Sequence, residues 1–233
     1  MSAALFAADL RLLWRHGFAI AYLVVAALYA AVLSALPRAW ADAVLPILAW
    51  SDPAFFCFFF AGASVCLDLA QGTFRSLFAS PLRPSDYLIV KALDLGILSF
   101  AMAAIVSASS RGADFSLWPL AASAAFGGAP AAMLGAALAL RLKSVNRFMM
   151  GSIPAFLVLA LPALDYAAGR YLPPWFGPVA ALSPGGASLA FARAAYAAVP
   201  AGELALGALA AAAWTAAIAR FALAPAVNAA RGD

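Results

Sequence analysis

Six long runs of apolar residues, separated by short polar links, dominate the pattern along the chain. Each run is close to the roughly 20 residues that a helix needs to cross the hydrocarbon core of a bilayer. The expected spans are Gly17–Leu36, Val44–Leu67, Ala92–Ser109, Leu117–Leu140, Phe148–Ala167 and Leu204–Leu223. Because a helix satisfies its backbone hydrogen bonds internally, the pattern predicts an all-α, polytopic membrane protein with one transmembrane domain over residues 1–233.

Two further segments fit no span. Residues 1–16 mix charged side chains with apolar ones, which predicts an amphipathic helix at the membrane interface rather than a cleavable signal. Residues 169–202, between the fifth and sixth spans, are rich in Pro and Gly. Their apolar part, Ala187–Val199, is too short to span and contains Arg193. We expect this extracytoplasmic region to hold a re-entrant or an interfacial helix.

Composition agrees with a membrane protein. Hydrophobic residues make up 67% of the chain, charged residues 10%, and the mean hydropathy is +0.97. A soluble domain needs far more charge to cover its surface. The net charge of +4 comes from basic residues in the short links. No basic run lies on a soluble face, so the charge does not indicate a nucleic-acid partner.

The basic residues also predict the orientation of the chain. Ten of the 14 Lys and Arg residues lie in links and flanks on the side of the two termini, and four lie on the opposite side. The four are Arg38, Arg111, Arg170 and Arg193. Basic residues are enriched on the cytoplasmic side of membrane proteins, so both termini are expected to be cytoplasmic.

Several kinds of chemistry are missing from the sequence. His16 is the only histidine, which excludes a Ser–His protease, and no cluster has the spacing of metal ligands. The chain has no phosphate-binding loop, so it is not expected to hydrolyse ATP alone. Cys57 and Cys66 would lie about 13.5 Å apart on a helix, too far for a disulfide. A transport or scaffolding role remains.

Residues 68–91 form the longest polar stretch and are expected on the cytoplasmic side. Thr73 can cap a short helix over Phe74–Ala79, and Pro81 follows its end. Phe74, Leu77 and Phe78 share one face of that helix. Two phenylalanines exposed on a cytoplasmic helix must be buried against a second surface. That surface is either the membrane or a socket on a soluble partner.

Asp52 lies within the second apolar run. A carboxylate near mid-membrane costs roughly 2.5–3.5 kcal/mol, so something must offset it. One interpretation is that Ser51 or Asp52 caps a helix that restarts at Pro53. The other is that Asp52 contacts substrate or takes part in proton-linked gating. Five aromatic residues follow on all sides of the helix, namely Phe55, Phe56, Phe58, Phe59 and Phe60.

Several of these segments resemble a known family. Gly72-Thr73-x-x-x-Leu77-x-x-x-Pro81-Leu82, followed by Tyr87-Leu88 and Lys91, resembles the coupling-helix region of ABC-2 type exporter permeases. Three more segments are similar to fluoroquinolone-export-type permeases: Ser51-Asp52-Pro53, Lys143–Arg147 and Leu161–Tyr166. The resemblance covers roughly Leu10–Phe221. One departure is Gln71, where family members usually carry a carboxylate. Asp68 is the acid that can match an upstream family position.

The resemblance implies an assembly in a bacterial inner membrane. It implies two permease subunits, identical or homologous, above two copies of an ABC ATPase that bind ATP and Mg. No cofactor is implied on this chain. The residues implied to couple to the ATPase are Gly72, Thr73, Phe74, Arg75, Leu77 and Phe78. The second and fifth spans are implied to line the central cavity. A tentative substrate path therefore comprises Asp52, Phe55, Phe56, Phe59, Phe60 and Phe156.

The expected function is that of an exporter permease subunit with no catalytic activity of its own. It would move an amphipathic or hydrophobic substrate outward, such as a drug, lipid or metabolite, powered by the separate ATPase. A haem-exporter-like permease of similar length is one alternative. An ATP-independent membrane protein that uses Asp52 as an ion or proton site is the other.

Overall fold

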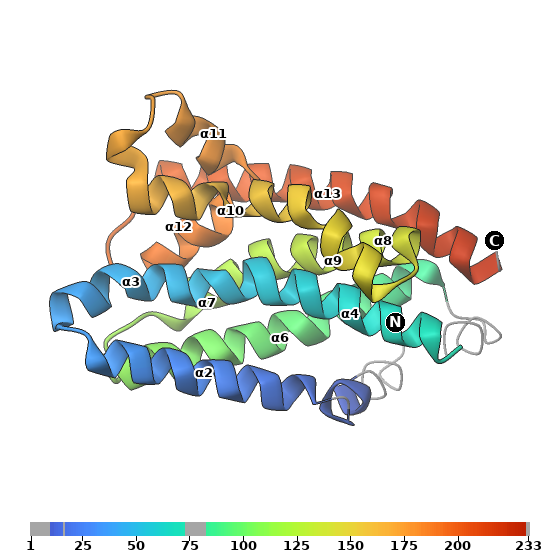
Figure 1. The fold of residues 1–233 in the computed structure, drawn as a ribbon. Helices are drawn as coiled ribbons and strands as arrows, with labels where there is room; N and C mark the ends of the chain where they lie inside the picture. The colour runs from blue at the N-terminus through green and yellow to red at the C-terminus, as the bar shows by residue number, and fades with distance from the viewer. Residues whose placement is uncertain (1–9, 16, 73–82, 232–233) are drawn as a thin grey trace.

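The computed structural model describes residues 10–15, 17–72 and 83–231. Within them the chain forms helices and no strand (Figure 1). Residues 10–15 are helical. The later elements are α2 (Phe18–Ala35), α3 (Arg38–Ser51), η1 (Asp52–Phe56), α4 (Cys57–Ala70), α6 (Pro84–Arg111), α7 (Leu117–Ser123), η2 (Ala124–Gly128), α8 (Ala129–Leu142), α9 (Val145–Gly151), α10 (Ile153–Ala168), η3 (Gly169–Tyr171), α11 (Phe176–Leu182), α12 (Gly186–Ala194) and α13 (Ala201–Arg231).

The six expected spans are confirmed as helices long and apolar enough to cross a membrane. The second is a single helical rod over Arg38–Ala70 that contains α3, η1 and α4. The expected start of the fifth span is wrong. The Ser144 hydroxyl accepts a hydrogen bond from the Arg147 amide at 3.3 Å and caps α9, and a separate helix, α10, begins at Ile153 next to a proline.

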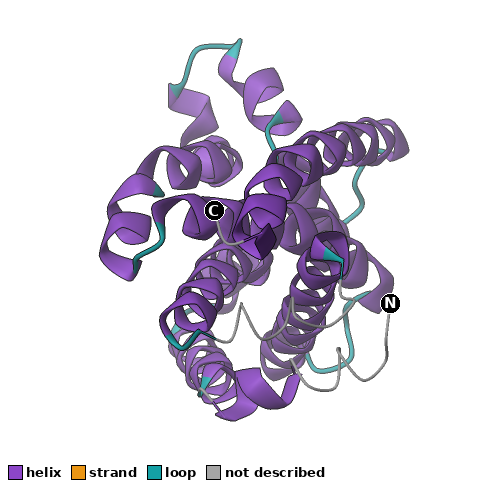
Figure 2. Cartoon of the chain, turned by 90° about the vertical axis from the view of Figure 1, so that its right-hand side faces the viewer, coloured by secondary structure: helices purple, strands orange, loops and turns teal. Residues whose placement is uncertain are grey.

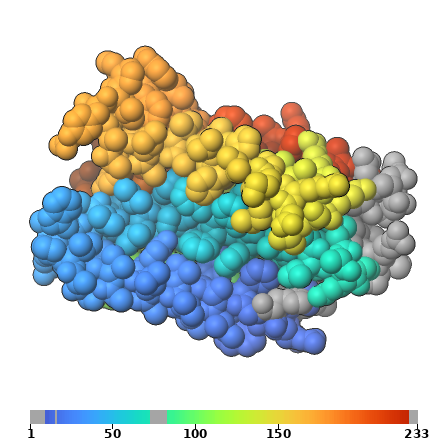
Figure 3. Space-filling model, viewed as in Figure 1, coloured from blue at the N-terminus to red at the C-terminus, as the bar shows by residue number. Residues whose placement is uncertain are grey.

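The long helices run side by side, and Figure 2 views them from one end. The start of α2 and the C-terminal ends of α4, α8 and α13 lie at one end of the bundle, here called the terminal end (Figure 1). The link between α2 and α3, together with α11 and α12, lies at the opposite end. In Figure 3 the segment around α11 (orange) projects from the side of the bundle near that opposite end. This placement of the helix ends agrees with a chain that crosses the membrane an even number of times.

The innermost helices are α4 and α8. In the span that contains α8, 67% of the most apolar window is buried, against 11% in the span that contains α10. The outer helices expose large apolar side chains, such as Val24 on α2, Leu157 on α10 and Leu209 on α13. Apolar side chains that face lipid acyl chains carry no free-energy penalty of the kind they carry in water. An outer surface of this composition therefore fits a bilayer.

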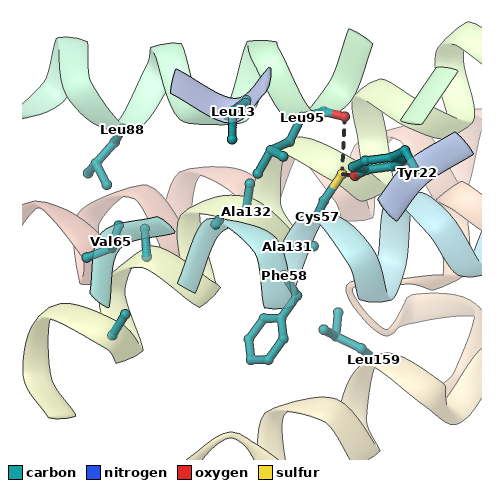
Figure 4. Close-up of a cluster of buried hydrophobic side chains, with 14 of the residues drawn as sticks. Leu13, Tyr22, Cys57, Phe58, Val65, Leu88, Leu95, Ala131, Ala132 and Leu159 are labelled. Carbon is teal, nitrogen blue, oxygen red and sulfur yellow. Dashed lines mark hydrogen bonds between the residues drawn. The ribbon is translucent and has the colours of Figure 1, made fainter. Parts of the chain in front are cut away.

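The closest helix contact lies between α4 and α8. A Cβ atom added to Gly135 would overlap the Phe58 carbonyl oxygen, so only glycine permits this approach. Figure 4 shows Phe58 beside the α8 residues Ala131 and Ala132. Small residues on α8 therefore bring the two central backbones together.

Replacement of Gly135 by alanine is expected to lower the free energy of unfolding by about 1–3 kcal/mol, because the backbones must separate. Gly96→Ala is the matched control, since Gly96 also lies in a helix but has no atom within 4 Å of an added Cβ. That change should be neutral or stabilising by up to about 1 kcal/mol. Thermal unfolding of the two purified variants in detergent measures the difference. Equal unfolding temperatures would contradict this account of the contact.

The segment 169–202 contains η3, α11 and α12. Helix α12 is buried among α3, α7 and α13. The Trp50 indole donates a hydrogen bond to the Gly185 carbonyl at 3.0 Å. Ser123 and Ser188 each donate a hydrogen bond to the other's carbonyl, at 2.8 and 2.9 Å. The short helix is thus held inside the bundle. Whether the segment is re-entrant depends on where the bilayer surface lies, and it stays a prediction.

The expected interfacial helix over residues 1–16 lies partly outside the described residues. In the described part, Leu13 is buried and Trp14 is exposed, so the two sides of the turn differ as an amphipathic helix requires.

Candidate functional site: a buried polar centre and the terminal end

A short π-helix, η1, lies in the middle of the second span. The backbone of Ser51 is helical, with φ −61° and ψ −30°, and no side chain caps the helix here. The Ser51 hydroxyl donates instead to the Leu48 carbonyl at 2.8 Å. The interpretation of Ser51 or Asp52 as a cap is therefore wrong. Pro53 has no amide hydrogen, and the π-helix accommodates this loss without ending the helix.

Asp52 is fully buried at the start of η1. No donor in the described residues forms a hydrogen bond of normal geometry with either carboxylate oxygen. The Ser99 hydroxyl of α6 lies beside this carboxylate, and the hydroxyls of Tyr22 and Tyr29 on α2 belong to the same region. Two helices, α2 and α6, thus place polar groups around one buried acid.

The polar groups near Asp52 are connected by weak contacts. The Tyr29 hydroxyl lies 3.1 Å from the Ser51 hydroxyl. The Cys57 thiol donates to the Leu95 carbonyl at 3.5 Å, and the Tyr22 hydroxyl lies 4.0 Å from the same sulfur (Figure 4). The sequence did not indicate that Tyr22 would belong to this centre.

A second π-helix, η2, packs against η1. A Cβ added to Gly127 would overlap the Ser188 hydroxyl of α12 and lie 3.3 Å from the Pro53 Cβ of η1, and one added to Gly128 would lie 3.3 Å from the Cys57 sulfur of α4. The two glycines therefore let η2 lie close to α12, η1 and α4 at once. Such π-helical segments are frequent at functional sites. Sequence reasoning missed η2, although Gly127-Gly128 followed by Pro130 in an apolar run was an available signal.

The aromatic residues of the tentative substrate path divide between two faces of the second span. Phe55 and Phe59 face α10, with ring centroids 4.5 and 5.7 Å from that of Phe156. These three side chains are the part of the tentative path that lies between the second and fifth spans. All of them are packed against neighbouring rings, and a role in substrate contact stays a prediction.

Phe56 and Phe60 face α2 instead. Their ring centroids lie 6.2 and 5.1 Å from that of Tyr22. Phe58 points into the core, with its ring 5.7 Å from Phe148 of α9. Because Asp52 also interacts with Tyr22, it is grouped with Phe56 and Phe60 rather than with Phe156.

A buried ion pair joins α4 to α6 near the terminal end. The Lys91 ammonium lies 3.6 Å from an Asp68 oxygen, and both side chains are at most 4% exposed. The Tyr87 hydroxyl donates a hydrogen bond to the same oxygen at 2.7 Å. This chain has Gln71 where members of the resembled family usually carry a carboxylate. The ion pair between α4 and α6 does not depend on that position, because Asp68 forms it. We call Asp68, Tyr87 and Lys91 the α4–α6 clamp.

The expected coupling helix follows directly after α4. Gly72 has φ +69°, a conformation that favours glycine, and it marks the end of α4. The other expected coupling residues, Thr73, Phe74, Arg75, Leu77 and Phe78, lie outside the described residues. Their role stays a prediction, but the clamp joins the two helices that flank them.

Comparison with known proteins places the whole arrangement in a family. The model of the fluoroquinolones export permease protein family matches residues 1–223. The fluoroquinolones export permease proteins of two Mycobacterium tuberculosis strains, CDC 1551 / Oshkosh and H37Rv, are each 28% identical over 160 residues, which is 68% of either chain. No solved structure matches. With its six membrane-spanning helices, the chain is a multi-pass membrane protein that belongs to the fluoroquinolones export permease protein family.

Proposed function

We propose that this chain is the membrane-spanning permease subunit of an ABC exporter. It moves an amphipathic or hydrophobic substrate out of the cell through a bacterial inner membrane, with both termini in the cytoplasm. The observation that carries the proposal is the family match over residues 1–223. The relatives in Mycobacterium tuberculosis are named as fluoroquinolones export permeases, which supports a drug as one substrate.

Energy for transport has to come from another chain. The sequence contains no phosphate-binding loop. In the proposed assembly, two ABC ATPase subunits bind ATP and Mg and dock against the link between α4 and α6. A second permease subunit, identical or homologous, completes the path. The α4–α6 clamp supports this arrangement, because it makes one rigid unit of the two helices that carry the link.

A proton- or ion-coupled transporter is the competing function that a specific observation favours. Asp52 is a buried acid in the middle of the bundle, and such acids serve as proton sites in many transporters. A haem-exporter-like permease has no comparable observation in its favour. The two leading functions differ in their energy source, which makes them separable in one assay.

The test is transport into inside-out membrane vesicles. The chain is co-expressed with a candidate ABC ATPase subunit from the same organism, and uptake of a fluoroquinolone is measured with ATP and with a proton gradient. We expect uptake only with ATP and only when both chains are present, and the ATPase should co-purify with the permease. An ATPase variant without its phosphate-loop lysine is the control. Uptake driven by the proton gradient alone would support the competing function instead.

A further inference from the structure

Asp52 is a buried acid for which no ion pair is found among the described residues. Lys91 pairs with Asp68, Arg111 with Asp42 and Arg193 with Glu203, and none of these pairs includes Asp52. Its carboxylate oxygens have no hydrogen-bond donor of normal geometry among the described residues. Burial of such a group is costly unless a partner appears in some state of the protein. Since the cap interpretation is wrong, local structure does not supply that partner.

A groove lies between α2 and α6 on the outer surface, and Tyr22 of the buried polar centre is one of its lining residues. Its volume is about 260 Å³, and its lining is apolar and aromatic, with Leu98 and Met102 on the α6 side and Tyr22 on the α2 side. Both helices expose large apolar side chains, including Leu23 and Ile105 in the groove itself. The groove therefore opens toward the lipid acyl chains.

Tyr22 belongs both to the lining of the groove and to the buried polar centre. Its side chain lines the groove, while its hydroxyl lies 4.0 Å from the Cys57 sulfur and within Coulombic range of Asp52. Ser99, the polar neighbour of Asp52, follows directly after the groove residue Leu98. Tyr22 is buried and is shared by the groove and the polar centre, so a route from one to the other requires its side chain to rotate.

We propose that Asp52, Tyr22 and Ser99 form a binding site for the cationic group of a lipophilic substrate, which enters from the bilayer through the α2–α6 groove. The carboxylate supplies the counter-charge. The rings of Tyr22, Phe56 and Phe60, whose centroids lie 5.1 to 6.2 Å apart, supply the aromatic faces that attract organic cations. This inference rests on the proposed exporter function and names its substrate class, an amphipathic organic cation.

The irregular backbone around Asp52 is suited to such a site. The two facing π-helices, η1 and η2, interrupt the regular helical hydrogen bonds of two spans at the same level. Non-helical hydrogen bonding at membrane depth is tolerated where protein surrounds it or where a cavity forms. The elements η1 and η2 are in contact, and Gly127 and Gly128 bring η2 close to Pro53 of η1 and Cys57 of α4, so a displacement of η1 would press on η2.

The test is direct binding of two probes of the same shape and opposite charge to the purified permease. Tetraphenylphosphonium is a permanent cation, and tetraphenylborate is the matched anion. We expect saturable binding of the cation to the wild type, weakened about 30-fold or more in Asp52→Asn, because the buried charge partner is lost. Asp52→Glu should keep most of the cation binding. Tyr22→Leu should weaken it about fivefold through the loss of one aromatic face.

The anion and a distant acid provide the controls. Binding of tetraphenylborate should not weaken in Asp52→Asn. Asp165→Asn, on α10 at the opposite end of the bundle, should bind the cation like the wild type. An Asp52→Asn variant that binds the cation normally, or a wild type without saturable binding, overturns the inference. Because this assay needs neither ATP nor the ATPase, its outcome is independent of the vesicle test of the proposed function.

Discussion

Replacement of Lys91 by methionine is expected to lower the free energy of unfolding by about 3–5 kcal/mol, because it leaves the Asp68 carboxylate buried without its cation. The Lys91 side chain is 1% exposed and its ammonium lies 3.6 Å from that carboxylate, so water cannot take its place. The Tyr87 hydroxyl, 2.7 Å away, still donates to Asp68 but cannot neutralise its charge. A change of this size is large for a single substitution.

The double variant Asp68→Asn, Lys91→Met is the decisive companion to this experiment. It removes both charges, so most of the lost stability should return. Arg111→Met is the matched control, since the Arg111–Asp42 pair is 17% and 39% exposed and should contribute at most about 1 kcal/mol. Thermal unfolding in detergent at constant protein concentration compares all three. A Lys91 variant no less stable than the Arg111 variant would contradict a buried ion pair.

The clamp also shows what sequence alone leaves out. Asp68 and Lys91 were both visible as charges at the ends of consecutive apolar runs. Their pairing depends on the rotation of α4 and α6 about their axes, which a low-complexity apolar sequence does not determine. The available signal was the sign of the charges: an acid at the end of one span and a base at the start of the next, on the same side of the membrane.

The six spans could be predicted because their cause is local. An apolar run of about 20 residues forms a membrane-spanning helix whatever its neighbours are, and the existence and order of the six helices were confirmed. The boundary at Phe148 was wrong because it depends on a serine cap and on Pro154, which are short-range features inside an apolar run. The burial of α12 among three helices was not predictable from its own sequence, since re-entrant and interfacial helices share one composition.

The site was only partly predictable for a similar reason. An acid within an apolar run singled out Asp52, but its sequence neighbours fitted a cap as well as a π-helix. The helical period placed Phe55 with Phe59 and Phe56 with Phe60, yet it did not say which pair would face α10 and which α2. Tyr22, Ser99 and η2 reach the acid through tertiary packing alone. The face formed by Phe74, Leu77 and Phe78 is tested by the ATPase-binding experiment below.

The double variant Phe74→Ala, Phe78→Ala is expected to insert into the membrane normally and to lose the ATPase subunit. In the proposed assembly, the face formed by Phe74, Leu77 and Phe78 is buried in a socket on the ATPase. Truncation of one phenylalanine at the centre of such an interface costs about 2 kcal/mol or more, which corresponds to a loss of affinity of about 30-fold. Two truncations should abolish co-purification at ordinary concentrations. Pull-down of the ATPase and its turnover in nanodiscs are the measurements.

Arg75→Ala is the matched control for this experiment, because it changes the same segment at the edge of the apolar face. A charge at the rim of an interface contributes little in water, so co-purification should persist. The competing interpretation, in which the phenylalanines rest on the membrane surface, predicts a different outcome. The double variant would then retain the ATPase and its substrate-stimulated turnover, and the proposed coupling role of Phe74 and Phe78 would be contradicted.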